Sequence, residues 1–127
     1  MRPLGDLEAE IMNRLWDWNR PTSVREVLDD INRVRPLAYT TVMTVMDNLH
    51  NKGIVSRERA GRAFLYTPTQ SRAEFSAELI SAAVRNTGDR AGALMHFIGE
   101  LTPKELAQLR QALDETDRPA RKKRRQT

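Results

Sequence analysis

Polar side chains that can contact nucleic acid gather on one face of a predicted helix that ends at Lys52-Gly53. The hydroxyls of Thr40 and Thr44 can hydrogen-bond base edges or place their methyl groups on thymine, and Tyr39 can reach a phosphate. Asp47 can accept from cytosine or pair with a nearby cation. The candidate DNA-contact residues of this helix are Tyr39, Thr40, Thr41, Met43, Thr44 and Asp47.

The next segment predicts a basic β-hairpin. Val55, Arg57 and Arg59 alternate along its first strand, and Arg62, Phe64 and Tyr66 alternate along its second, with the reversal at Ala60-Gly61. Arg57, Arg59 and Arg62 are therefore candidates for phosphate contacts. Arginines on an exposed hairpin also serve simply to discourage aggregation. The order of elements, a helix followed directly by a basic hairpin, favours the DNA interpretation.

Apolar periodicity places these elements in a larger unit. Ala38, Val42, Val45 and Leu49 recur at helical spacing and predict the inward face of the helix. Upstream, the pattern predicts one helix from about Asp6 to Trp18 and a second that opens with a Ser23/Glu26 capping box. Three helices followed by a hairpin are typical of a winged helix-turn-helix. The predicted fold is mainly α with a small β-hairpin.

Beyond Pro68 the pattern predicts three short helices. Ser71 opens the first, which ends near Gly88; Asp89 opens the second, which ends near Gly99; Thr102 and Pro103 open the third. These helices carry too little apolar area to fold alone, so we expect a second copy of the chain to complete their core. The candidate dimerisation residues are Phe75, Leu79, Leu94, Phe97, Ile98, Leu106, Leu109 and Leu113.

The net charge of +4 is unevenly distributed over the 127 residues. Residues 118–127 hold six basic groups and no acid, whereas residues 20–66 hold eight basic and five acidic groups. Positive charge thus coincides with the predicted helix and hairpin, as a phosphate-binding surface requires. The predicted organisation is a winged-helix domain over 1–68, a helical dimerisation domain over 69–117 and a disordered basic tail over 118–127.

Composition disfavours several other functions. The chain has no cysteine, no predicted signal peptide and no stretch that could span a bilayer, so we expect a cytoplasmic protein without direct membrane binding. His50 and His96 lie in no metal-binding motif, and the glycines form no phosphate-cradling loop. We therefore expect no enzymatic activity, no catalytic residue, no metal and no cofactor. The competing interpretation is a winged-helix module that binds protein, which predicts an acidic or apolar face on the third helix.

Four segments resemble the penicillinase-repressor (BlaI/MecI/CopY) family of bacterial transcriptional regulators. They are GDLEAEIMNRLW, TSVREVLDDI, LAYTTVMTVMDNLHNKGIVSRERAGRAFLYTP and ALMHFIGELTPKELAQLRQAL, which together cover nearly the whole chain except the basic tail.

The resemblance implies a homodimeric repressor. Its N-terminal winged helix would bind a dyad-symmetric operator and its C-terminal helices would dimerise. It further implies, for the antibiotic-resistance branch, release by a membrane sensor-protease that responds to β-lactam and cuts an Asn-Phe bond. This sequence has His96-Phe97 at that position, which makes it the candidate cleavage bond. The cysteine motif of the copper-responsive branch is absent.

Overall fold

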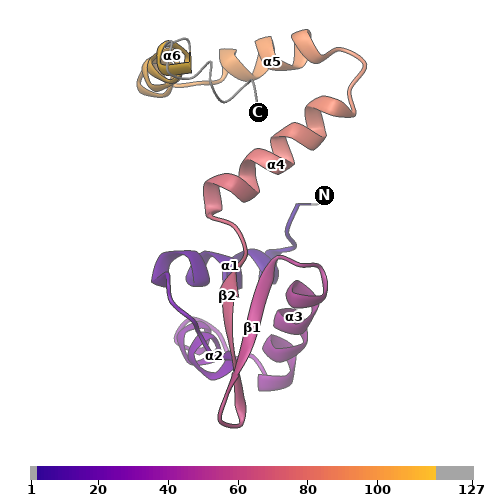
Figure 1. Cartoon of the computed structure of the whole chain (residues 1–127), viewed down its shortest axis with the longest axis vertical. Helices are drawn as coiled ribbons and strands as arrows, with labels where there is room; N and C mark the ends of the chain where they lie inside the picture. Colours follow the sequence, from indigo (N-terminus) through magenta and orange to yellow (C-terminus); the bar gives the residue numbers. More distant parts are fainter. Residues whose placement is uncertain (1–2, 117–127) are drawn as a thin grey trace. The chain divides into compact units, whose positions relative to one another are not determined.

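The computed structural model describes residues 3–116, which fall into two compact units that meet between Ala82 and Ala83. Residues 117–127, which include the predicted basic tail, lie outside the described residues. The elements, labelled in Figure 1, are α1 (Asp6–Trp18), α2 (Val24–Asn32), α3 (Tyr39–Asn51), β1 (Val55–Ala60), β2 (Ala63–Pro68), α4 (Arg72–Arg85), α5 (Arg90–Gly99) and α6 (Pro103–Thr116). The predicted fold class, mainly α with one β-hairpin, is confirmed.

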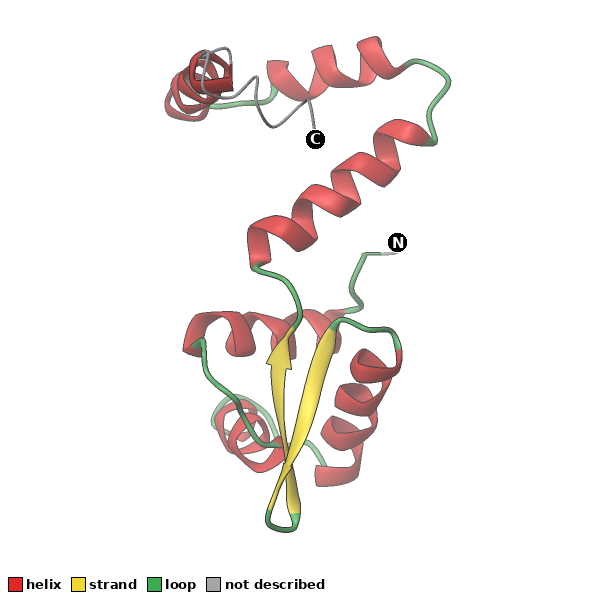
Figure 2. Cartoon of the chain, viewed as in Figure 1, coloured by secondary structure: helices red, strands yellow, loops and turns green. Residues whose placement is uncertain are grey.

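The first unit has one hydrophobic core, built where α1, α2 and α3 meet the hairpin. Figure 2 shows the two strands lying beside α3, with α1 near their open end. Each of the three helices contributes a stripe of buried side chains, and each strand contributes one buried residue. The core residues are Ile11, Met12 and Leu15 of α1; Val24, Val27, Leu28 and Ile31 of α2; Val42, Met46 and Leu49 of α3; and Val55 and Tyr66 of the strands.

The α2 helix begins at the predicted capping box. The amide of Ser23 donates to Glu26 Oε1 at 3.0 Å, and the amide of Glu26 donates to Ser23 Oγ at 3.1 Å. The hydrogen bond from the Ser23 amide is the largest effect on Glu26 and lowers its pKa. Burial, the next largest effect, raises the pKa, and Arg20, 2.7 Å away, lowers it. The capping box thus fixes the start of α2 and favours the ionised carboxylate.

Because its pKa is lowered, Glu26 is predicted to make a pH-dependent contribution to the free energy of unfolding. Ionised Glu26 stabilises the folded chain above the ordinary glutamate pKa, and this contribution is lost as the pH falls through the lowered pKa. We expect Glu26→Gln to reduce the free energy of unfolding by less than about 1 kcal/mol at about pH 7, because the carboxylate is partly exposed and screened. The deficit of this variant should be smaller at about pH 3 than at about pH 7. Urea unfolding at both pH values measures this, and an equal deficit at both would contradict it.

The inward face of α3 differs from the sequence-based expectation at two positions. Ala38 is exposed because it precedes the helix as its N-cap, with an extended backbone. Met46, absent from the predicted inward face, is completely buried, and Val45 is only partly so. Val42, Met46 and Leu49 also recur at helical spacing, so they form one face of α3. The buried face is therefore rotated slightly from the predicted one, toward Met46 and away from Val45. Gly53, with φ +80°, ends the helix as expected.

The hairpin pairs Val55 with Pro68 at its open end and Ala60 with Ala63 at its tip. Gly61 and Arg62 therefore form a two-residue turn, in which Gly61 supplies the positive φ of 63°. The prediction that Arg62 lies on the second strand is wrong, because that strand begins one residue later. At mid-strand, the backbone of Tyr66 exchanges two hydrogen bonds with Thr22, which ties β2 to the segment before α2.

The first part of α4 packs against α1. Phe75 is 3% exposed, and its ring lies 5.6 Å from that of Trp16, centroid to centroid. Arg72 pairs with Asp17 at 2.8 Å and lies over the Trp16 ring. Phe75, a candidate dimerisation residue from the sequence, thus already has its apolar surface covered within its own chain. The helix ends at Arg85, three residues before the predicted end.

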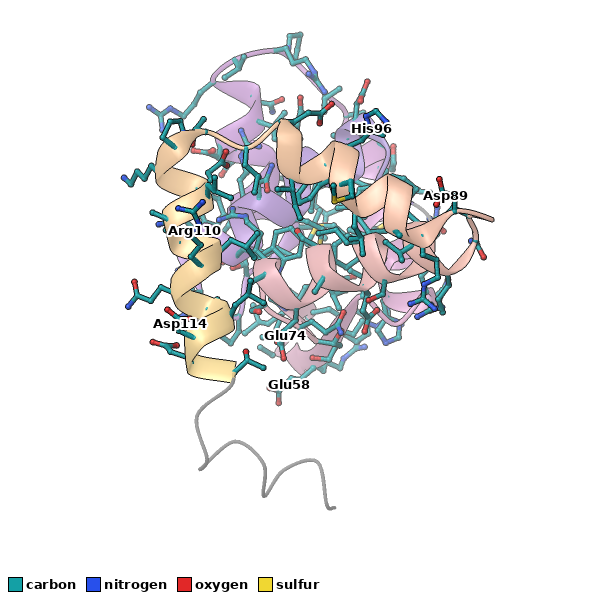
Figure 3. The ribbon with its side chains drawn as sticks, turned by 90° about the horizontal axis from the view of Figure 1, so that it is seen from above. Glu58, Glu74, Asp89, His96, Arg110 and Asp114 are labelled. Carbon is teal, nitrogen blue, oxygen red and sulfur yellow. The ribbon has the colours of Figure 1, made fainter. Side chains whose placement is uncertain are left out.

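The second unit contains α5 and α6, which both begin at the predicted residues. Asp89 caps α5 by accepting from the Gly92 amide, and Thr102 and Glu105 form a capping box at the start of α6. Figure 3 shows Asp89 at the start of α5 and His96 farther along it, with Arg110 and Asp114 on α6. Neither helix has a buried residue, so the described part of this unit has no core of its own. No helix within residues 3–116 has the length and apolar character to cross a membrane.

Candidate nucleic-acid interface

The exposed face of α3 carries a row of uncharged polar side chains. Thr40, Thr41 and Thr44 are all exposed, as the sequence predicted. Asn48, one turn beyond Thr44, is exposed on the same face. It was not among the predicted residues, although its i+4 spacing from Thr44 places it on that face. Hydroxyl and amide groups on one helix face can donate to and accept from base edges.

The start of α3 meets the start of α2. Tyr39 is 41% exposed, and the Arg25 guanidinium lies 5.2 Å from the centre of its ring. Arg25 also approaches Asp29 at 3.8 Å, with both side chains largely exposed. Arg25 was not among the candidate residues. Its contact with Tyr39 joins two helices, so residue spacing along either helix gave no signal for it.

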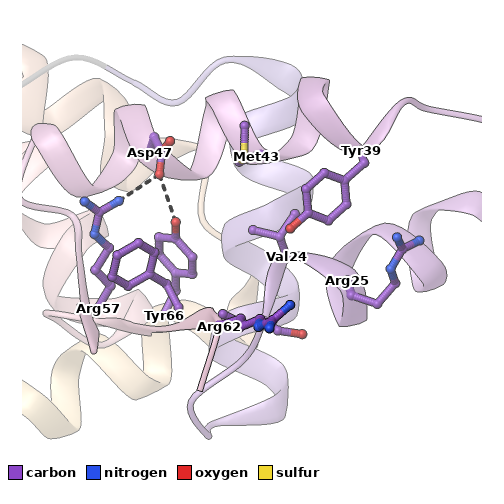
Figure 4. A pocket seen from close by; sticks show the side chains of 11 residues that line it. Val24, Arg25, Tyr39, Met43, Asp47, Arg57, Arg62 and Tyr66 are labelled. Carbon is purple, nitrogen blue, oxygen red and sulfur yellow. Dashed lines mark hydrogen bonds and ion pairs between the residues drawn. The ribbon is translucent and has the colours of Figure 1, made fainter. Parts of the chain in front are cut away.

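Asp47 links α3 to both strands of the hairpin. Its Oδ1 accepts from Arg57 Nη1 at 2.8 Å and from the Tyr66 hydroxyl at 2.9 Å (Figure 4). Burial, more than the neighbouring Asp47 carboxylate, raises the pKa of Tyr66. The phenol therefore stays protonated and donates at neutral pH. Of the two roles that the sequence left open for Asp47, pairing with a nearby cation occurs in this structure.

The three hairpin arginines differ in their surroundings. Arg57 pairs with Asp47 and also lies 4.2 Å from the centre of the Phe64 ring. Arg59 lies 5.3 Å from the same ring, and Arg62 is exposed in the turn. Within residues 3–116, neither Arg59 nor Arg62 has a carboxylate at ion-pair distance. These two cations are therefore available to an anionic partner.

A cleft of about 430 Å³ lies between α3, the start of α2 and the hairpin. Its apolar lining includes Val24, Met43 and Phe64, and Arg25 and Arg62 contribute positive charge to it. Figure 4 shows Arg62 projecting from the hairpin near Val24, with Tyr39 on the α3 side. Met43 is partly buried, packs against the core and also lines the cleft.

The two histidines lie far apart along the chain and belong to different units. His50, late in α3, has a buried Nδ1 that finds no hydrogen-bond partner among the described residues, and His96 is exposed on α5. Among residues 3–116, no three His, Asp or Glu side chains are grouped as a metal site would require.

A polar helix face beside an arginine-bearing hairpin, on a three-helix core, defines a winged helix-turn-helix. The family model for the penicillinase repressor matches residues 4–115. The chain therefore belongs to the penicillinase repressor family, which consists of transcriptional regulators and not of enzymes.

Individual relatives agree with this assignment. The transcriptional regulator BlaI of Mycobacterium tuberculosis is 40% identical over 117 residues, which cover 90% of this chain and 85% of that protein. The penicillinase repressor of Bacillus licheniformis is 25% identical over 117 residues, covering 88% and 90%. Among solved structures, the monomeric form of Bacillus licheniformis BlaI in complex with the blaP half-operator matches with a TM-score of 0.48 and 25% identity, covering 57% of this chain and 88% of that one.

Proposed function

We propose that this protein is a transcriptional repressor that binds a dyad-symmetric DNA operator as a homodimer. The observation that carries the proposal is the exposed Thr40, Thr41 and Thr44 face of α3 beside two unpaired hairpin arginines. The 40% identity to the transcriptional regulator BlaI of Mycobacterium tuberculosis supports this function.

In the proposed complex, α3 enters the major groove and the hairpin follows the backbone. Thr40, Thr44 and Asn48 would contact base edges, whereas Arg59, Arg62 and Tyr39 would contact phosphates. Arg25, at the start of α2, adds a cation on the other side of the cleft. Contacts to phosphate set the position of the protein, and contacts to bases set the sequence preference.

The dimer would form through the second unit. Neither α5 nor α6 contains a buried residue, yet several of their large apolar side chains are exposed: Leu94 by 43%, Met95 by 71%, Phe97 by 50%, Ile98 by 39% and Leu113 by 56%. Leu79, Leu106 and Leu109 are partly buried. Two short helices without a core need a partner, and a second copy offers the same apolar side chains in a self-complementary arrangement.

The proposed signal is exposure to a β-lactam. The name of the Bacillus licheniformis relative, penicillinase repressor, supports control of a resistance gene. Release of the repressor from DNA would follow cleavage of the His96-Phe97 bond by a membrane sensor-protease. Both residues are exposed on α5.

The direct experiment selects bound duplexes from a random-sequence library with the purified protein. We expect an enriched sequence with two related half-sites whose centres lie about 10 bp, or a multiple of that, apart. A protein-binding module is the alternative, and it would enrich no sequence. The uncharged polar face of α3 favours DNA over that alternative.

Substitutions in α3 and in the hairpin turn should separate base reading from phosphate binding. We expect Thr44→Ala to lower affinity for the enriched duplex by about 1–3 kcal/mol and to leave scrambled duplex unaffected. Arg62→Ala should weaken binding to both duplexes and reduce the slope of log K against log salt by about 0.9. Fluorescence anisotropy across a salt series measures both effects. An unchanged salt slope for Arg62→Ala, together with unchanged sequence preference for Thr44→Ala, would contradict these roles.

A further inference from the structure

One carboxylate oxygen joins the helix that faces DNA to both strands of the hairpin. Asp47 Oδ1 accepts from Arg57 on β1 at 2.8 Å and from Tyr66 on β2 at 2.9 Å (Figure 4). Tyr66 is itself held firmly, because it is 1% exposed and its backbone exchanges two hydrogen bonds with Thr22. The bond to Asp47 therefore fixes α3 against a rigid part of the hairpin.

This arrangement also changes the charge that the hairpin presents. Arg57 is neutralised by Asp47, and its guanidinium lies over the Phe64 ring at 4.2 Å. An arginine held in an ion pair does not add to the free cations that displace counterions from DNA, and that displacement drives sequence-independent binding. Arg59 and Arg62, on the same hairpin, remain unpaired within residues 3–116.

We propose that Asp47 determines DNA specificity without contacting a base. It masks the charge of Arg57, which limits attraction to any duplex, and it holds the hairpin in a fixed position against α3. Both actions favour the correct sequence, because binding to a random duplex depends almost wholly on the number of free cations, whereas binding to an operator depends on geometry in addition. The inference rests on the proposed DNA-binding function.

The chain offers a matched control for charge. Glu58 lies on β1 next to Arg57 and is exposed, and within the described residues its carboxylate has no hydrogen bond or ion pair. Glu58→Gln removes one negative charge near Arg57, as Asp47→Ala does, but from the hairpin and without releasing Arg57. Tyr66→Phe is the complementary variant, because it removes one donor to Asp47 and changes no charge.

The experiment measures binding of each variant to the duplex enriched by the wild type and to a scrambled duplex of equal composition. Asp47→Ala should bind the scrambled duplex severalfold more tightly, with a salt slope steeper by about 0.9 than that of Glu58→Gln. It should also bind the enriched duplex more weakly than the wild type. Asp47→Asn keeps an acceptor but loses the charge, so it should match Asp47→Ala on the scrambled duplex and recover affinity for the enriched one.

Tyr66→Phe should weaken binding to the enriched duplex with no change in salt slope, and hydrogen exchange of its hairpin amides should become faster. The inference is overturned if Asp47→Ala behaves as Glu58→Gln on both duplexes. It is also overturned if Asp47→Ala alters preference at a single base pair only, since that result would show direct base reading. A wild type that binds no duplex would overturn the proposed function itself, which distinguishes the two failures.

Discussion

Leu113→Asp is expected to convert the proposed dimer to monomers at micromolar concentration. In the single chain, Leu113 is 56% exposed, so an aspartate there would face solvent and leave the fold intact. In the proposed dimer the same carboxylate would be buried against the partner without a counter-charge, which costs several kcal/mol. Analytical ultracentrifugation measures the change in mass, and circular dichroism checks that helix content is kept.

Loss of the dimer should greatly weaken operator binding. When two winged helices are linked in one dimer, binding of the second half-site is intramolecular. This raises the affinity for the operator by on the order of a hundredfold or more. The monomer should keep only the affinity of one winged helix for one half-site. Gln111→Asp adds the same charge to the opposite, exposed face of α6 and should remain dimeric. A Leu113→Asp protein that still forms a dimer at micromolar concentration would place the contact elsewhere.

Cleavage at His96-Phe97 is also expected to abolish repression, because it too would break the proposed dimer and so weaken operator binding. The cut would leave residues 90–96 of α5 with the winged helix and separate it from residues 97–99 and from all of α6, and so remove the link between the two winged helices of the proposed dimer. Both residues are exposed on α5, which has no buried side chain to hold it closed. A protease needs an extended segment, and a short helix without a core opens at low cost in free energy.

Mass spectrometry of the repressor from cells exposed to a β-lactam tests this cleavage. We expect two fragments, residues 1–96 and 97–127, to appear as the target genes are switched on. Phe97→Ala should leave the chain intact and block induction. Leu94→Ala removes a similar apolar side chain from the same helix and should still be cut, which controls for effects on the dimer. Induced genes with an uncut wild-type chain would exclude this route.

Local sequence signals determined the elements of this protein and their order. Capping residues act on backbone amides two or three positions away, so Ser23 with Glu26, Asp89, and Thr102 with Glu105 mark helix starts without any knowledge of the fold. Gly53 ends α3 for an equally local reason, its positive φ. The family resemblance followed from the same stretches of sequence and is confirmed by the family model.

Partners across the fold were decided only by the tertiary structure. The pairing of Asp47 with Arg57 and Tyr66, the burial of Phe75 on Trp16 and the approach of Arg25 to Tyr39 all join different elements. Such contacts depend on how helices and strands pack, and a one-residue difference in phase or register changes which side chains meet. The inward position of Met46 and the turn position of Arg62 differed from expectation for this reason. The sequence therefore predicted candidate DNA-contact residues, and packing decided which of them are already paired within the chain.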